Sequence, residues 1–341
     1  MKKRHVGLSI LLLFVAVTPA MARDDGVFRV AAVAPSAIND LAFSQSMYDA
    51  LVSVQEELGA DKFQFDFLGD TSVVDDAAVA LREWASSGDY ALLIAHGSQY
   101  ETIVEELAAD FPEVSFAREN YVDTIRLDNV FDYSASAGEG GYVNGVLAAN
   151  LSDSGVIGVI GPFEVGDAKP YVDGFVRGVA SVDQAITVNV VYIQSFSDVP
   201  LAAEVARDQI TDDADVLTGT AQMVVGPIEV AVEDDVLWFG TQSSQASISE
   251  DVGVAFQVYK WDVLLKDMIA EIQAGVPGGE AYTLTLANKG LVMEVHERTD
   301  VDEDGMAVEG QLQSLADEII AGIVDGSIQP LPEEMVEAEG K

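Results

Sequence analysis

The chain has 341 residues, no cysteine, and a formal net charge of −41 from 58 acidic and 17 basic residues. Without cysteine it can form neither disulfides nor a thiolate metal site or nucleophile, and its acidity opposes binding to nucleic acid or to an anionic membrane surface. A chain of this length is expected to form two domains. The acidic residues are scattered along most of the predicted helices, which favours general solubility in a salty medium over a dedicated cation-binding surface.

The N-terminus predicts export. Three basic residues at positions 2–4 precede an apolar run over 8–17 and a small-x-small pattern at 20–22. Together they are typical of a signal peptide over residues 1–22 that is cleaved after Ala22. The apolar run is shorter than the roughly 20 residues that a membrane-spanning helix needs, so an uncleaved anchor is the less favoured alternative. Because no cysteine follows to carry a lipid, we expect a mature protein that is free in the periplasm, or secreted, and does not insert into the membrane.

From residue 28 onward, short apolar runs alternate with amphipathic stretches. Runs of about four to eight residues, rich in Val, Ile and Leu and closed by Gly or Pro, are typical of buried parallel strands. Strands are predicted at 28–35, 63–69, 90–97, 114–117, 156–162, 187–193, 216–221 and 237–241. Helices are predicted at 43–58, 73–84, 100–109, 142–151, 170–182 and 201–210. The alternation predicts an α/β fold in which right-handed crossovers build parallel sheets covered by helices on both faces.

The strand–helix units fall into two sets, each large enough for one doubly wound lobe. Two extended segments, 130–138 and 253–260, each lie between a strand–helix set and another helix. We expect the chain to cross between the lobes there, so these segments are the predicted hinge crossovers. The predicted division gives lobe 1 residues 27–130 plus about 260–280, and lobe 2 residues 135–253 plus about 281–296.

Residues 297–341 are expected to form an acidic loop, a C-terminal helix over 312–324 and a tail. In the loop, Asp300, Asp302 and Asp304 alternate as in the opening of a calcium-binding loop. The twelfth position of such a loop is Gln311, where a bidentate Glu is needed. An ordinary solvated acidic turn is therefore the favoured interpretation, and no bound metal is predicted.

The components of common enzyme active sites are missing from the sequence. His5 lies in the predicted signal peptide, which leaves His96 and His296, and no Gly-x-Ser-x-Gly, His-Glu-x-x-His or Walker motif occurs. Catalytic triads and zinc sites therefore lack residues. Acid pairs are too frequent in this sequence to be informative, so a hydrolase that uses carboxylates alone stays open. We predict no enzyme and no cofactor.

Polar and aromatic residues gather at the predicted strand ends. In doubly wound sheets, ligands bind beyond the carboxyl ends of the strands, and amide and aromatic side chains there suit a flat polar ligand. The candidate residues are Asn39, Asp40, Phe43, Ser44, His96, Gly97, Phe196, Gln222, Met223 and Gln242. Other roles stay open for single residues, since Asp40 or Ser44 could cap the following helix and His96 could be either structural or a ligand contact.

Six segments of the sequence carry a family resemblance. They are NDLAFSQSMYDAL (39–51), YALLIAHG (90–97), FPEVSFA (111–117), EGGYVNGVLAANLSDSGVIGVIG (139–161), YIQSFSD (192–198) and LANKGLVMEV (286–295). In order and spacing they resemble the basic membrane protein (Bmp, PnrA-like) family of ABC-transporter substrate-binding proteins, and the similarity runs from about residue 27 to 300. The resemblance implies the periplasmic binding protein type I fold, in which two doubly wound lobes are joined by hinge crossovers.

The resemblance also implies roles for several residues. Phe43 matches the aromatic residue that stacks on a base, with Asp40 and Ser44 beside it, while Lys260 matches the family's lysine after the crossover strand. Ser44 stands where the family usually has Asn, and Gln242 where nucleoside binders usually have an Asp that accepts hydrogen bonds from sugar hydroxyls. Because an amide both donates and accepts, Gln242 leaves open a nucleobase or another heterocycle in place of a ribonucleoside.

We therefore expect the solute-binding component of an ABC import system. It would act as a monomer that captures a small flat polar ligand, a purine nucleoside or nucleobase-like compound, by lobe closure and delivers it to a permease in the inner membrane. The main alternative is an extracytoplasmic sensor domain for a sugar, amino acid or flavin-type ligand. A hydrolase that uses carboxylates is a further alternative. A repressor is disfavoured, because no helix-turn-helix precedes residue 27 and the charge opposes DNA binding.

Overall fold

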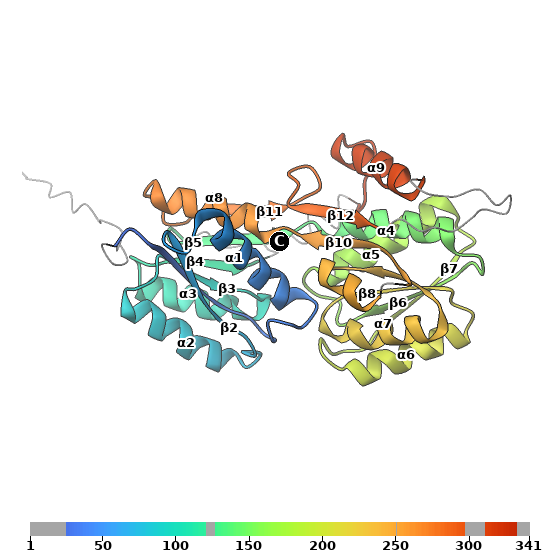
Figure 1. Ribbon diagram of the computed structural model, residues 1–341, viewed down its shortest axis with the longest axis horizontal. Coiled ribbons are helices and arrows are strands. Elements are labelled where there is room, and N and C mark those ends of the chain that lie inside the picture. Colours follow the sequence, from blue (N-terminus) through green and yellow to red (C-terminus); the bar gives the residue numbers. More distant parts are fainter. Residues whose placement is uncertain (1–24, 121–126, 250, 297–310, 333–341) are drawn as a thin grey trace, which may run out of the picture.

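The computed structural model describes residues 25–120, 127–249, 251–296 and 311–332. They form two α/β lobes that lie side by side along the long axis of the molecule (Figure 1). Each lobe is built on a six-stranded sheet with helices around it, so the predicted two-lobed α/β architecture is confirmed. No helix within these ranges is both long and apolar enough to cross a membrane.

The first lobe has an entirely parallel sheet in the order β11-β5-β4-β3-β1-β2. Its elements are β1 (Phe28–Val33), α1 (Phe43–Leu58), β2 (Phe63–Leu68), α2 (Val74–Ser87), β3 (Leu92–Ala95), α3 (Glu101–Asp110), β4 (Ser115–Glu119), β5 (Val130–Ala135), α8 (Trp261–Gln273) and β11 (Ala281–Leu284). Successive strand residues point to opposite faces. Accordingly, Val30 lies in the core beneath α1 and α8, whereas Ala31 lies in the core beneath α2 and α3.

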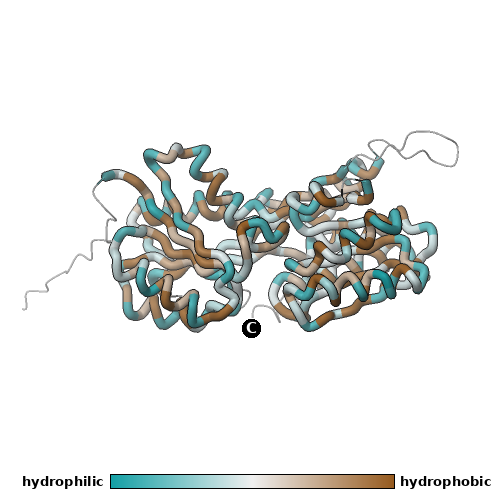
Figure 2. The backbone as a smooth tube through the Cα atoms, turned by 60° about the horizontal axis from the view of Figure 1, so that its bottom comes forward, coloured by the Kyte–Doolittle hydropathy of each residue, from teal (hydrophilic) through white to brown (hydrophobic). Residues whose placement is uncertain are grey.

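The second lobe repeats this layout in the order β12-β10-β9-β8-β6-β7, in which β12 is antiparallel to β10 and the other pairs are parallel. Its elements are α4 (Ala137–Leu151), β6 (Val156–Gly161), α5 (Ala168–Val182), β7 (Thr187–Tyr192), α6 (Val199–Thr211), β8 (Val216–Gly219), α7 (Val225–Asp234), β9 (Leu237–Gly240), β10 (Gly253–Tyr259), β12 (Leu291–Val295) and α9 (Gln311–Val324). Helices α4 and α5 cover one face and α6 and α7 the other, while α9 packs on α4 and β12. In both lobes, hydrophobic (brown) and hydrophilic (teal) segments alternate along the chain (Figure 2).

Within the described ranges the chain crosses between the lobes three times. The crossings are at Ser136 between β5 and α4, at Lys260 between β10 and α8, and at residues 285–290 between β11 and β12. They are hydrogen-bonded to one another, because Ser136 N donates to the Leu284 carbonyl (2.8 Å) and Lys260 N donates to the Gly290 carbonyl (2.7 Å). The three crossings therefore form one connected hinge.

The crossings differ in two ways from the division that the sequence predicted. Segments 130–138 and 253–260 each contain a crossing, but most of each segment is a sheet strand, β5 or β10. The assignment of about 281–296 to the second lobe is wrong for its first part, because β11 pairs in parallel with β5 of the first sheet. Strand β11 has four residues and one buried side chain, so its own sequence carries little signal, and the open edge of β5 decides where it pairs.

Helices α4 and α5 approach one another closely because glycines lie at their contact. A Cβ atom on Gly145 would lie 2.1 Å from the carbonyl oxygen of Phe175, and a Cβ atom on Gly174 would lie 2.2 Å from that of Gly138. No side chain fits at such a separation, so glycine is required for the close backbone approach. Since α4 follows the first crossing directly, this contact fixes how the second lobe is attached to the hinge.

An aromatic cluster anchors the start of α1 in the first lobe. The Phe43 ring stacks on the His96 imidazole, with centroids 3.8 Å apart and planes 6° apart, and Trp261 meets both rings edge-on. His96 Nε2 donates to the Phe43 carbonyl (3.1 Å), and Nδ1 accepts from the Tyr133 hydroxyl (2.9 Å). Burial lowers the pKa of His96 to about 3, so the imidazole is neutral in this tautomer near pH 7.

The close contact of α4 and α5 predicts that replacing a glycine there by alanine lowers stability, although alanine favours helices. In an open helix, Gly→Ala would stabilise by about 1 kcal/mol, but Gly145→Ala should lower the free energy of unfolding by about 1–3 kcal/mol, because the methyl group overlaps the Phe175 carbonyl. Urea denaturation followed by circular dichroism measures the change. Ser181→Ala, at an exposed position of α5, should stay within about 0.5 kcal/mol. A stabilised Gly145→Ala variant would contradict the close packing of α4 on α5.

The buried His96 predicts a specific loss of stability in acid. The unfolded chain binds a proton at His96 below about pH 6.5, whereas the folded protein does so only near pH 3, so the free energy of unfolding falls as the pH drops between these values. At pH 5 this amounts to about 2 kcal/mol. In His96→Gln the amide can donate and accept like the imidazole but does not titrate. The wild type should therefore lose about 2 kcal/mol more than the variant in urea titrations at pH 7 and pH 5, and equal losses would contradict a neutral buried His96.

Candidate functional site

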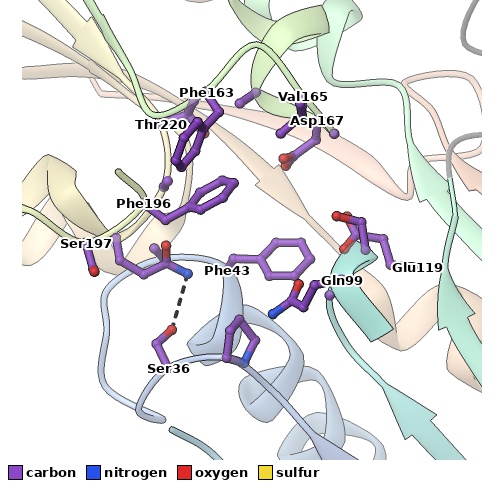
Figure 3. Close-up of a pocket in the computed structure, with 18 of the residues that line it drawn as sticks. Ser36, Phe43, Gln99, Glu119, Phe163, Val165, Asp167, Phe196, Ser197 and Thr220 are labelled. Carbon is purple, nitrogen blue, oxygen red and sulfur yellow. Dashed lines mark hydrogen bonds between the residues drawn. The ribbon is translucent and has the colours of Figure 1, made fainter. Parts of the chain in front are cut away.

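A cavity of about 620 Å³ lies between the two lobes. Its walls include the loops that follow β1, β2 and β3 in the first lobe, with Glu119 at the end of β4, and the loops that follow β6, β7, β8 and β9 in the second, with Tyr259 at the end of β10. These are the carboxyl ends of parallel strands, where doubly wound folds bind ligands. In Figure 3, side chains from both lobes converge on this space.

Five of the candidate residues line the cavity. They are Phe43, Gly97, Phe196, Gln222 and Gln242. Phe43 and Gly97 come from the first lobe and the other three from the second, so the structure brings together positions that are far apart in the sequence. These five residues line the cavity, and their contact with a ligand stays a prediction.

Asp40 and Ser44 lie outside the cavity lining and hold the loop before α1. The Asp40 carboxylate accepts hydrogen bonds from the backbone N–H groups of Ala42 (2.9 Å), Ser44 (3.1 Å) and Gln45 (3.0 Å), and so caps the helix. Ser44 is fully buried, and its hydroxyl accepts a hydrogen bond from the Ser36 N–H. Both residues therefore hold the loop that positions Phe43. Asp40 has the helix-capping role that was the alternative to ligand contact.

The other four candidates also lie outside the lining. His96 is fully buried beneath the ring on which it stacks, with both nitrogens hydrogen-bonded, which is the structural role left open above. Met223 is fully buried, and its backbone N–H donates to the Phe196 carbonyl. Asn39 and Lys260 have exposed side chains, and Lys260 takes part in the hinge through its backbone.

The cavity also contains residues that the sequence did not single out. Among them are Ser36, Gln99, Glu119 and Asp167. Phe163, which directly follows the predicted strand 156–162 and belongs to a strand end that the sequence points to, also lines the cavity. Asp167 directly precedes α5 rather than ending a strand, and Glu119 still belongs to β4, so neither fits the pattern of polar residues just beyond a strand.

Three phenylalanine rings contribute to the apolar part of the cavity. The rings of Phe163 and Phe196 are in contact, with centroids 4.9 Å apart and planes 48° apart, and Phe43 reaches toward them from the first lobe (Figure 3). Phe196 is 45% exposed. A large apolar ring left open inside a cavity is a surface for a ligand, since burying it against another ring is favourable.

The backbone around the cavity adopts conformations that most residues avoid. Ala221 has φ 73° and ψ −178°, a region that is almost exclusive to glycine, and Gln194 has φ 58°. Gly97 has φ 148°, which side-chain-bearing residues rarely adopt, so glycine is needed there. Such conformations cost about 1–3 kcal/mol each for non-glycine residues and concentrate at ligand-binding sites.

Polar groups complete the lining. Four glutamines, Gln99, Gln194, Gln222 and Gln242, offer amide groups that both donate and accept hydrogen bonds. Among the lining residues that the structure describes, the charged ones are acidic, namely Glu119 and Asp167. Burial raises the pKa of Asp167, while the hydroxyl that Tyr259 donates to it (2.8 Å) and the nearby backbone N–H groups act in the opposite direction.

Two side chains of the second lobe reach across to the first. Gln222 Nε2 donates to Ser36 Oγ (3.2 Å; dashed in Figure 3), and Gln245 Nε2 donates to the Leu41 carbonyl (3.2 Å). Ser36 Oγ in turn donates to the Asp40 carboxylate. The second lobe is thereby hydrogen-bonded to the loop that presents Phe43, so the two walls of the cavity are connected directly as well as through the hinge.

Metal binding finds no support in the described parts of the chain, where no group of three or more His, Asp or Glu side chains is placed to hold an ion. The calcium-like series Asp300, Asp302 and Asp304 lies outside the described residues.

Several characterised proteins are similar to this chain. A transcriptional activator protein of Bacillus subtilis is 25% identical over 74% of this chain and 78% of its own length. A purine-binding protein of Brucella abortus is 26% identical over 81% of this chain and 75% of its own. An ABC transporter nucleoside-binding protein of Lactococcus lactis is 24% identical over 79% of this chain and 82% of its own.

The fold is shared with solved structures. A solute-binding protein of an ABC transporter system from Aeropyrum pernix superposes with a TM-score of 0.76 at 19% identity, over 91% of this chain and 96% of that one. The sequence model of one family, described as ABC transporter substrate-binding protein PnrA-like (Bmp), matches residues 27–322. Substrate-binding proteins of ABC transporters bind small molecules, interact with permeases and are not enzymes. With its two-lobed fold and interlobe cavity, the chain belongs to this PnrA-like family of substrate-binding proteins.

Proposed function

We propose that this protein, as a monomer, captures a flat polar heterocycle between its lobes and delivers it unchanged to an ABC permease. The ligand is a purine nucleoside or a nucleobase-like compound. The observation that carries the proposal is the cavity of about 620 Å³ with its three phenylalanine rings and its glutamine amides. Its volume suits a molecule of this size, and the rings offer stacking surfaces. The amides can form hydrogen bonds with polar atoms at the edge of a heterocycle. Two relatives that carry the names purine-binding and nucleoside-binding support the same class of ligand.

Closure of the lobes is the proposed capture step. The hinge consists of short crossings that can rotate while they remain hydrogen-bonded to one another. The bonds from Gln222 to Ser36 and from Gln245 to Leu41 need the two lobes to be close together. They therefore support a closed form in which the ligand is shielded from water, and their loss would accompany release.

The stacking role is tested at Phe196, because this ring is 45% exposed and contributes little to either core. A panel of nucleosides, nucleobases and riboflavin is first screened by thermal shift, together with mass spectrometry of any compound that co-purifies. For the compound that binds, Phe196→Ala should lower the affinity by about tenfold or more, since stacking on a base is worth about 1–3 kcal/mol. Isothermal titration calorimetry measures the change.

The matched control for Phe196→Ala is Leu201→Ala. Leu201 is an exposed apolar residue in α6 of the same lobe and does not line the cavity, so this variant should bind the ligand as tightly as the wild type. A panel in which no compound raises the melting temperature would contradict the proposed ligand class. An unchanged affinity in Phe196→Ala would contradict stacking on this ring.

We further propose that the protein reaches the periplasm by export and that its signal peptide is removed after Ala22. The basic residues at 2–4 and the small residues at 20–22 support this. In an expressing cell, N-terminal sequencing of the periplasmic protein should therefore read from Arg23 onward.

A substitution at the cleavage position tests the same proposal. Ala22→Leu places a large side chain where a small one is needed, so it should slow cleavage and leave a larger, membrane-associated precursor that gel electrophoresis of cell fractions detects. Thr18→Ser lies outside the small-x-small pattern at 20–22 and should be processed like the wild type. A full-length protein in the cytoplasm would contradict the export proposal.

A second candidate function is ligand sensing. One relative is named as a transcriptional activator, so a member of this family need not serve only transport. The acidic charge opposes DNA binding by this chain, which leaves a sensor that hands its signal to a partner protein. Loss of nucleoside uptake in a deletion strain favours transport, whereas normal uptake with altered gene expression favours sensing. Release of free base from an incubated nucleoside would instead indicate a hydrolase.

A further inference from the structure

Asp167 directly precedes α5 at the second-lobe wall of the cavity. It occupies the N-cap position, where an aspartate usually bonds to the helix N–H groups, yet its side chain makes no helix-capping hydrogen bond. Instead, Asp167 Oδ2 accepts the Tyr259 hydroxyl at 2.8 Å. Helix capping therefore does not fix this carboxylate, and its side chain is directed into the cavity (Figure 3).

Tyr259 holds the Asp167 carboxylate in place. The tyrosine is 5% exposed, its ring packs edge-on against Trp261 (centroids 5.1 Å apart), and its oxygen accepts a hydrogen bond from Gln257 Nε2 (3.0 Å). Because the hydroxyl accepts from Gln257, its single proton is committed to Asp167. A carboxylate can accept about four hydrogen bonds, so Asp167 retains acceptor capacity on the side that faces the cavity.

A ligand in the cavity can supply a further donor to this carboxylate. Taking a carboxylate out of water is unfavourable unless donors replace the lost hydration, and burial accordingly raises the pKa of Asp167. Among the described residues, Tyr259 is the side chain that donates to it. A heterocycle stacked on the phenylalanine rings presents its edge to the polar walls, and the donors in such an edge are N–H groups.

We propose that Asp167 is a specificity-determining residue that accepts a hydrogen bond from an amino group or a protonated nitrogen of the ligand. It thereby selects amine-bearing heterocycles over analogues that lack the amine and over anionic ones. The proposal rests on the proposed function, since it concerns the ligand of the same cavity, and it names one group that this ligand must carry.

The test compares two pairs of nucleosides that differ in one exocyclic amine: adenosine with purine riboside, and guanosine with inosine. Isothermal titration calorimetry with the wild type should show the amine-bearing member of at least one pair binding about tenfold or more tightly, as expected for a hydrogen bond to a charged group. Adenosine monophosphate should bind more weakly than adenosine. In Asp167→Asn the tyrosine still donates to the amide oxygen, so the NH₂ group faces the ligand and the preference should disappear.

Two further variants separate this role from other effects. Asp208→Asn removes one negative charge from an exposed position of α6 in the same lobe and should keep the wild-type preference. Tyr259→Phe leaves the carboxylate but removes its anchor, and should reduce the preference less than Asp167→Asn does. If Asp167→Asn does not fold, as judged by its melting curve, the change in preference is read from Tyr259→Phe.

The outcomes distinguish the inference from the proposed function. If the wild type binds members of both pairs equally, or if the preference survives in Asp167→Asn, the role of Asp167 is overturned while binding of a heterocycle stands. If none of the nucleosides binds and the wider panel also gives no ligand, the proposed function fails, and the role of Asp167 falls with it.

Discussion

The hinge is the constraint on which the rest of the structure depends. Its three crossings are short and hydrogen-bonded to one another through the backbone, and Glu139 adds a half-buried carboxylate that accepts from Leu286 N (2.7 Å). The core beneath α1 and α8 in the first lobe continues through the hinge to the core beneath α4 and α5 in the second. This packed connection holds the strand ends of both sheets toward the same interlobe space.

Residues outside the cavity lining hold Phe43 in its position. Asp40 caps α1, and His96 supports the Phe43 ring from below while it holds the Phe43 carbonyl. Asp40 satisfies backbone N–H groups at the start of the helix, which would otherwise lose hydrogen bonds on burial. Phe43 is consequently presented to the cavity from a rigid base. Rigid presentation matters for binding, because a ring that is already ordered loses little entropy when a ligand stacks on it.

The second lobe contributes a different kind of wall. Phe196 is nearly half exposed, the backbone at Ala221 and Gln194 is strained, and Asp167 holds a carboxylate away from bulk water. Each of these features costs stability in the free protein. A ligand that covers the ring and donates to the carboxylate would offset part of that cost, which is consistent with a site that is completed by binding.

The sequence by itself determined the two-lobed α/β fold, because runs of buried β-branched residues alternate with amphipathic helices, and local periodicity is enough to reveal them. It also located the strand ends, and so found Phe43, Gly97 and Phe196. Tertiary structure alone decided that β11 joins the first sheet, since pairing depends on which edge is open, and that Asp167 faces the cavity. Whether a polar residue near a strand end contacts ligand or backbone depends on which groups pack around it, and spacing along the chain does not contain that information.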